Sequence, residues 1–122
     1  MSAIRSFREL RVWQGAMSLV ESVYRLSAAF PIEENYGLKS QIRRAAVSIP
    51  SNIAEGNARA STREYLNHLS VAQASLAEVE TQLEIAVRLK YLEEEQATST
   101  VGDIQTLGKQ LHALRKALEA RK

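Results

Sequence analysis

Residues 41–56 read QIRRAAVSIPSNIAEG, and this stretch is the most informative part of the chain. Apolar residues recur at helical intervals on both sides of Pro50, and Gly56 follows as a C-terminal stop. A proline inside a helix removes one backbone hydrogen bond and clashes with the preceding turn, which costs about 3 kcal/mol. We therefore expect a helix that bends at Pro50, with Ser48 and Ser51 bonding the backbone groups that the proline frees.

Four amphipathic segments cover most of the chain. They span about residues 7–30, 32–55, 61–91 and 93–120. In each segment the apolar residues recur in steps of three and four, which is the period of an α-helix. Short connections between long helices favour antiparallel neighbours. The sequence therefore predicts an all-α fold, a single domain over residues 1–122 that forms an up-and-down antiparallel four-helix bundle with a proline-bent second helix.

The last three segments each carry one core stripe. The segment 61–91 also begins with Ser61-Thr62-Arg63-Glu64, which has the form of a capping box. Its stripe is an unbroken heptad seam, which suits the small crossing angles of a bundle. The stripes comprise Leu38, Ile42, Ala45, Ile49 and Ile53, then Tyr65, Leu69, Ala72, Leu76, Val79, Leu83 and Ala86, and finally Val101, Ile104, Leu107, Leu111, Leu114 and Leu118.

The first segment carries more apolar surface than one bundle core absorbs. Its apolar residues form two parallel stripes rather than one. Large apolar patches on the surface of a chain usually mark an interface with another chain. We therefore expect the bundle to assemble with itself. The stripes are Val12, Ala16, Leu19, Val23, Leu26 and Phe30, and Leu10, Trp13, Met17, Val20 and Tyr24.

Composition narrows the classes of function. The chain contains no cysteine, which excludes disulfides, a thiol nucleophile and thiolate metal ligands. Its first residues are too charged for a signal peptide, and no apolar run approaches the ~18 residues of a membrane span. We therefore expect a soluble cytoplasmic protein that makes no use of a membrane.

Charge is distributed unevenly along the chain. Residues 1–63 hold nine Lys and Arg against five acids, whereas residues 64–122 hold seven against nine. A basic region can attract a polyanion such as a nucleic acid, and an ordinary solvated surface is the alternative interpretation.

Several short motifs accompany the block 41–56. They are Phe7, Leu10, Val12-Trp13-Gln14, Val23-Tyr24, Phe30-Pro31, Glu34, Tyr36-Gly37-Leu38, Arg59, Ser61, Glu64-Tyr65 and the run from Ser75 to Leu83. Together these motifs resemble the four-helix bundle proteins that are also called 23S rRNA-intervening-sequence proteins. The resemblance covers about residues 7–92, and the last segment fits it by pattern alone.

The resemblance implies both an architecture and a kind of function. Proteins of this family are up-and-down four-helix bundles that assemble into homopentameric rings. They are similar to the accessory variability determinant proteins of diversity-generating retroelements, which partner a reverse transcriptase and bind nucleic acid through a basic surface. By this resemblance we expect a non-enzymatic accessory protein that forms a homopentamer, binds RNA or DNA and has a reverse transcriptase as a candidate partner. The alternative is a structural scaffold for protein interactions that binds no nucleic acid.

Basic residues near the end of the second segment and the start of the third are the candidate nucleic-acid ligands. Repeated around a ring, they would hold a phosphate backbone by salt-sensitive electrostatic contacts. The alternative is that Arg43 and Arg44 form ion pairs with acids of the same bundle or of a neighbouring one. If the second and third segments run antiparallel, Lys39 lies level with Glu78, and Arg43 is within reach of it. The candidates are Arg59, Arg63, Lys39, Arg43 and Arg44.

Catalytic and metal-binding patterns are weaker. Arg63 and His68 have the spacing found in HEPN ribonucleases, in which the histidine acts as acid or base and the arginine stabilises phosphate charge. Five helical steps place them about 140° apart, so on a regular helix they diverge. A di-iron bundle needs Glu-x-x-His on two helices, but Glu64 to His68 is one residue too long and His112 has no such glutamate. We expect no catalytic residue, no metal site and no cofactor.

Overall fold

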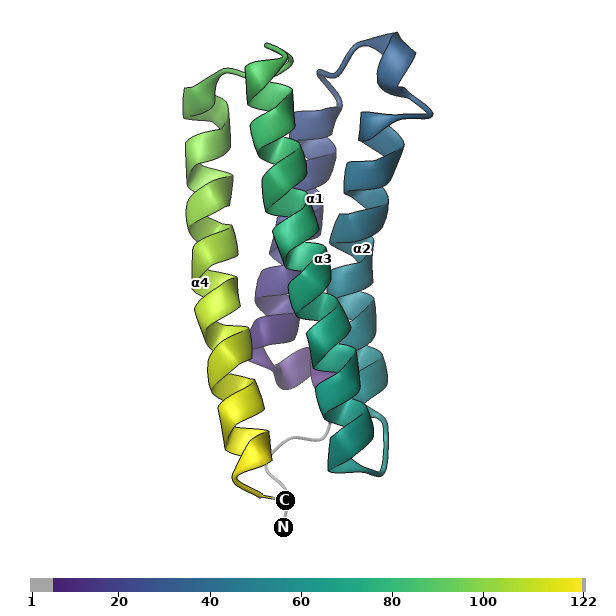
Figure 1. Cartoon of the computed structure of the whole chain (residues 1–122), viewed down its shortest axis with the longest axis vertical. Coiled ribbons are helices and arrows are strands. Elements are labelled where there is room, and N and C mark those ends of the chain that lie inside the picture. Colours follow the sequence, from purple (N-terminus) through teal and green to yellow (C-terminus); the bar gives the residue numbers. More distant parts are fainter. Residues whose placement is uncertain (1–5, 122) are drawn as a thin grey trace.

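The computed structural model describes residues 6–121. Four long helices lie side by side in it, with directions that alternate along the chain (Figure 1). The prediction of an up-and-down four-helix bundle is confirmed. In this range the elements are η1 (Phe7–Glu9), α1 (Arg11–Ser27), η2 (Ile32–Glu34), α2 (Leu38–Asn57), α3 (Thr62–Arg88) and α4 (Glu94–Glu119), where η1 and η2 are 3₁₀ helices.

Each α-helix packs against two others. Helix α2 lies between α1 and α3, and α4 completes the square by packing against α3 and α1. As a result, segments far apart in the sequence meet at the two ends of the bundle (Figure 1). We call the end formed by residues 6–11, 55–64 and 115–121 the lower end. The upper end is formed by residues 25–39 and 84–95.

The core follows the predicted stripes. The five predicted core residues of α2 are all buried, and so are all members of the α3 seam except the partly buried Tyr65. In the second stripe of α1, Leu10, Trp13 and Val20 are partly buried against the core, whereas Met17 and Tyr24 are each 41% exposed. Part of the extra apolar surface of α1 therefore stays uncovered within one subunit.

The helix boundaries differ from those predicted. The first segment breaks at Leu10, whose extended backbone separates η1 from α1. Helix α1 ends at Ser27 rather than at residue 30, because the next turn tightens to a bond from Phe30 N–H to Ser27 O. Helix α2 begins at Leu38, since the residues predicted to open it form η2 instead. Helix α3 ends three residues before the predicted boundary, and α4 is shorter by one residue at each end.

The sequence suggested that Gly56 ends α2, but the structure shows that it does not. The helix continues to Asn57, and no glycine in the described range has a positive φ. Gly56 instead lets α2 approach α3, because a Cβ at this position would lie 2.8 Å from the Cβ of His68 and 2.9 Å from Cδ1 of Tyr65. Pro50 lies inside α2 and is buried. The bend at Pro50 stays a prediction.

Glu34 connects three parts of the upper end. Its Oε1 accepts a hydrogen bond from the N–H of Leu38 at 2.9 Å, and its Oε2 accepts one from the hydroxyl of Tyr91 at 2.8 Å. The backbone bond, and after it the Tyr91 bond, lower the pKa of Glu34 below its usual value. The same Glu34 contact raises the pKa of Tyr91. The carboxylate thus caps α2, whose N-cap residue Gly37 has no side chain to do so.

Replacing Glu34 by glutamine is expected to remove an acid-sensitive part of the stability. Because folding lowers the pKa of Glu34 below 4.5, its contribution is present above that pH and is lost as the pH falls through the folded-state pKa. Urea unfolding of both proteins, measured from about pH 7 to about pH 3, should show the difference between them shrinking below about pH 4.5. A difference that stays constant over this range would contradict the role of the carboxylate.

Candidate nucleic-acid interface

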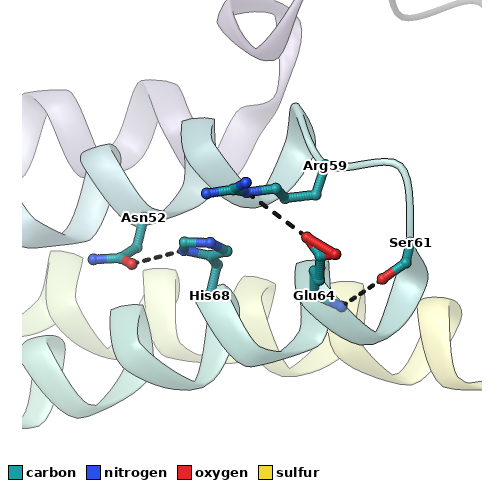
Figure 2. A network of polar contacts seen from close by, with 5 residues as sticks. All are labelled: Asn52, Arg59, Ser61, Glu64 and His68. Carbon is teal, nitrogen blue, oxygen red and sulfur yellow. Dashed lines mark hydrogen bonds and ion pairs between the residues drawn. The ribbon is translucent and has the colours of Figure 1, made fainter.

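The connection between α2 and α3 presents Arg59 beside the start of α3. The hydroxyl of Ser61 accepts a hydrogen bond from the N–H of Glu64 at 3.0 Å, so this half of the predicted capping box is confirmed. The carboxylate of Glu64 turns towards Arg59, with 3.9 Å between Oε2 and Nε (Figure 2). Both side chains are about half exposed, and such ion pairs contribute little. Arg59 can therefore exchange Glu64 for a phosphate at small cost.

A polar seam joins α2 to α3 next to this connection. Asn52 donates from Nδ2 to the carbonyl and the hydroxyl of Ser48, at 2.9 and 3.1 Å. Its Oδ1 therefore faces Nδ1 of His68 at 3.0 Å, and that ring nitrogen carries the proton (Figure 2). The hydroxyl of Ser75 donates to that of Ser48 at 2.9 Å. The hydroxyl of Ser48 thus bonds Ser75 across the helix pair and Asn52 within α2, rather than a carbonyl freed by Pro50.

Arg63 and His68 do not converge. Helix α3 is continuous through both residues, so they point to different sides of it. His68 is partly buried against α2, whereas Arg63 is exposed and its side chain bonds no residue of the described range. The structure therefore does not bring together the pair that the ribonuclease hypothesis requires.

The five candidate ligands fall into two groups. Arg59 and Arg63 lie at the lower end, as the sequence suggested. Lys39 and Arg44 line an open hollow between α1 and α2 in the upper half of the bundle. The thirteen helical steps from Arg44 to Asn57 correspond to about 20 Å of helix. The five residues are therefore not one cluster around the α2–α3 connection.

Arg43 has a structural role at the end of α1. Its Nε donates to the hydroxyl of Ser27 at 2.7 Å, and its Nη2 donates to the carbonyl of Tyr24 at 3.1 Å. The guanidinium also lies over the ring of Tyr24, 4.3 Å from its centre. A cation that bonds the last carbonyls of a helix complements the helix dipole. Within the subunit Arg43 therefore bonds α1 atoms rather than the acid that the ion-pair alternative expected.

Further basic residues join Arg59 and Arg63 at the lower end. They come from η1, the start of α1 and the end of α4, and all are exposed. Sequence analysis missed them because no local motif marks them. The up-and-down topology was the available signal, since it places the beginning of the first helix, the second connection and the end of the last helix together. These residues are Arg8, Arg11, Lys116 and Arg121.

The two ends of the bundle differ in charge. The three stretches of the lower end contain seven Lys and Arg against four glutamates. The two stretches of the upper end contain four Lys and Arg against six glutamates. An anion that approaches the bundle is therefore attracted to the lower end and repelled from the upper end.

Other kinds of site are not apparent in the described range. Residues 6–121 contain no group of three His, Asp or Glu side chains placed to hold a metal ion. None of the helices described is both long and apolar enough to cross a bilayer.

The fold and its charged end define a class of protein, an up-and-down four-helix bundle with one basic end. The chain belongs to the 23S rRNA-intervening sequence protein family, whose sequence profile matches residues 8–113. This match extends the resemblance seen in the sequence into α4.

A solved structure shares the fold. It is the crystal structure of a protein with unknown function from the S23 ribosomal protein family of Bacteroides thetaiotaomicron. The two chains are 25% identical and superpose with a TM-score of 0.79, over 86% of this chain and 98% of that one. No curated protein matches the sequence.

Proposed function

We propose that this protein is a non-enzymatic homo-oligomer, a pentameric ring, that binds RNA or DNA through the lower ends of its subunits. The observation that carries this proposal is the gathering of exposed arginines and lysines from three separate parts of the chain at one end of the bundle. Arginine is suited to this role because its planar guanidinium forms paired hydrogen bonds with phosphate.

Assembly would bring together the modest positive charges of the lower ends of several subunits. In a ring whose axis runs along the bundles, the lower ends of all subunits lie on the same side. A nucleic acid that lies across this side contacts several subunits at once, so that weak contacts add up. Each phosphate contact releases counterions, so the affinity falls as the salt concentration rises. The assembled ring rather than the single subunit is therefore the binding form.

The double substitution Arg59→Glu and Arg63→Glu is expected to lower nucleic-acid affinity by at least about tenfold. It removes two phosphate ligands and adds two repelling charges in every subunit. The salt dependence should therefore also become shallower, by about one unit of slope for each phosphate ligand removed. Fluorescence anisotropy with labelled RNA and DNA strands of equal length, repeated at several salt concentrations, measures both quantities.

The matched control carries the same charge change at the upper end. Arg25 and Arg88 are exposed and belong to the last turns of α1 and α3, at the upper end, so Arg25→Glu with Arg88→Glu should retain the affinity of the wild type. Equal decreases in affinity for the two double variants would show a general effect of net charge. Absence of binding by the assembled wild type at low salt would refute the proposal and favour a scaffold for protein interactions.

A further inference from the structure

A groove with an apolar lower part and a basic upper part runs between α1 and α2 on the surface of the subunit. Its lower part is an open hollow of about 340 Å³ lined almost entirely by apolar side chains. Its upper part, which shares Val47 with the lower part, is lined by Lys39, Arg43 and Arg44. We call the whole surface the α1–α2 groove. The lining of its lower part is Trp13, Met17, Val20, Val47, Pro50, Ser51 and Ala54.

A second uncovered surface lies on the outer side of α3. Val71, Glu78 and Ile85 are spaced seven residues apart, which is close to two helical turns, so they form one line along the helix. All three are exposed, and the two apolar side chains are exposed by 47% and 40%. We call this line the α3 ridge. Its heptad spacing is that of a helix which packs against other helices.

The groove and the ridge match in height along the bundle. Ser48 of α2 is level with Ser75 of α3, because their hydroxyls are bonded. One turn further up, Arg44 is level with Glu78, rather than Lys39 as the sequence had suggested. One turn down from the same bond, Ser51 is level with Val71.

The charges at the matching height lack an ionic partner within the subunit. The side chain of Arg44 bonds no residue of the described range, and the carboxylate of Glu78 accepts a hydrogen bond only from the side-chain amide of Gln82, at 3.2 Å. Higher up, Tyr36 lies near the level of Ile85, yet its side chain is fully exposed. The groove and the ridge therefore have complementary apolar and charged parts that the single subunit leaves uncovered.

We propose that the α1–α2 groove of each subunit receives the α3 ridge of a second copy of this chain, with Arg44 facing the partner's Glu78. This inference rests on the self-assembly in the proposed function and deepens it by naming the two surfaces. Rotation about an axis parallel to the bundle leaves every residue at its own height. Such a rotation brings the partner's Val71 to the apolar lower groove and the partner's Ile85 to Tyr36.

The two surfaces are different, so the contact is heterologous. A heterologous contact leaves one groove and one ridge free at the ends of any open chain, and these free surfaces meet when a ring closes. Because the contact uses α1, α2 and α3 along their lengths, it leaves the basic lower ends open. The nucleic-acid surface and the assembly surface are therefore separate.

Single charge reversals at the matched pair are expected to weaken assembly. Arg44→Glu or Glu78→Arg places like charges opposite each other at every contact, which is unfavourable at an interface. Light scattering coupled to size-exclusion chromatography measures the subunit concentration at which half of the protein is assembled. For each variant alone, this concentration should be at least about tenfold higher than for the wild type. Far-ultraviolet circular dichroism should show unchanged helix content, because both side chains are on the surface.

Mixing the two single variants provides the decisive test. In a mixture, the acidic groove of one variant meets the basic ridge of the other, and the unchanged Arg44 of the second meets the unchanged Glu78 of the first. Assembly should therefore return, apart from one mismatched contact in a ring with an odd number of subunits. An ion pair within one subunit would not be restored by mixing. The double variant Arg44→Glu with Glu78→Arg should assemble without a partner.

The controls separate this inference from the proposed function. Asp103→Arg and Lys109→Glu reverse exposed charges on α4, which belongs to neither surface, and should leave assembly unchanged. A wild type that assembles while the single variants assemble equally well would overturn the groove-and-ridge contact alone. A wild type that stays monomeric at high concentration would overturn the self-assembly itself.

Discussion

Replacing Ile49 by alanine is expected to lower the free energy of unfolding by about 2–5 kcal/mol. Ile49 is fully buried in the centre of α2, one residue before Pro50, where neighbouring side chains have little freedom to close a cavity. Urea denaturation followed by circular dichroism, at one fixed subunit concentration because assembly shifts apparent stability, measures the change.

A graded pair of substitutions makes this result specific. Ile49→Val removes one methylene from the same place and should cost only about 0.5–1.5 kcal/mol. The ratio of the two losses in the free energy of unfolding reports how tightly the core is packed around Ile49. A decrease of under about 1 kcal/mol for Ile49→Ala would show that the centre of the bundle is loosely packed and would contradict the structure.

Substitution of Gly56 is expected to destabilise the protein, although glycine is a poor helix residue. In an exposed helix, alanine is more favourable than glycine by about 1 kcal/mol. At this position the added Cβ would lie under 3.0 Å from atoms of Tyr65 and His68, so α2 and α3 must separate. We expect Gly56→Ala to cost about 1–3 kcal/mol and Gly56→Val to cost more.

Gly102 supplies the matched control. It lies inside α4, is exposed, and has no atom within 4 Å of an added Cβ. Gly102→Ala should therefore raise the free energy of unfolding by about 1 kcal/mol. We therefore expect the free energy of unfolding to fall in Gly56→Ala and to rise in Gly102→Ala. Stabilisation by Gly56→Ala would disprove the close approach of α2 and α3.

The positions of the helices were predictable because hydrophobic periodicity is a local signal. The stripes through Ile49 and Leu69 identified the buried faces correctly, and Ser61 was recognised as the residue that caps α3. The ends of α1 and α2 were harder. They depend on contacts such as the bonds from Leu38 and Tyr91 to Glu34, and the Tyr91 bond joins residues far apart in the sequence.

The candidate site was only partly predictable. Arg59 and Arg63 belong to one loop and the helix that follows it, so their proximity could be inferred. Arg43 could not be assigned from sequence, because whether it meets solvent, an acid or the end of α1 depends on the rotation of α2 about its axis. The bond from Arg43 to Ser27 shows that this rotation turns its side chain to α1.

The number of helices, their buried faces, the excess apolar surface of α1 and the family could all be inferred from the residues and their spacing within each segment. Which residues of that surface stay exposed, and which charges meet at the lower end, follow from the packing of the helices alone. The physical reason is that periodicity fixes the face of a helix that turns inward, whereas heights and neighbours depend on how separate helices pack. The matched levels of Arg44 and Glu78, and the use of Gly56 for close packing rather than as a helix stop, both come from that packing.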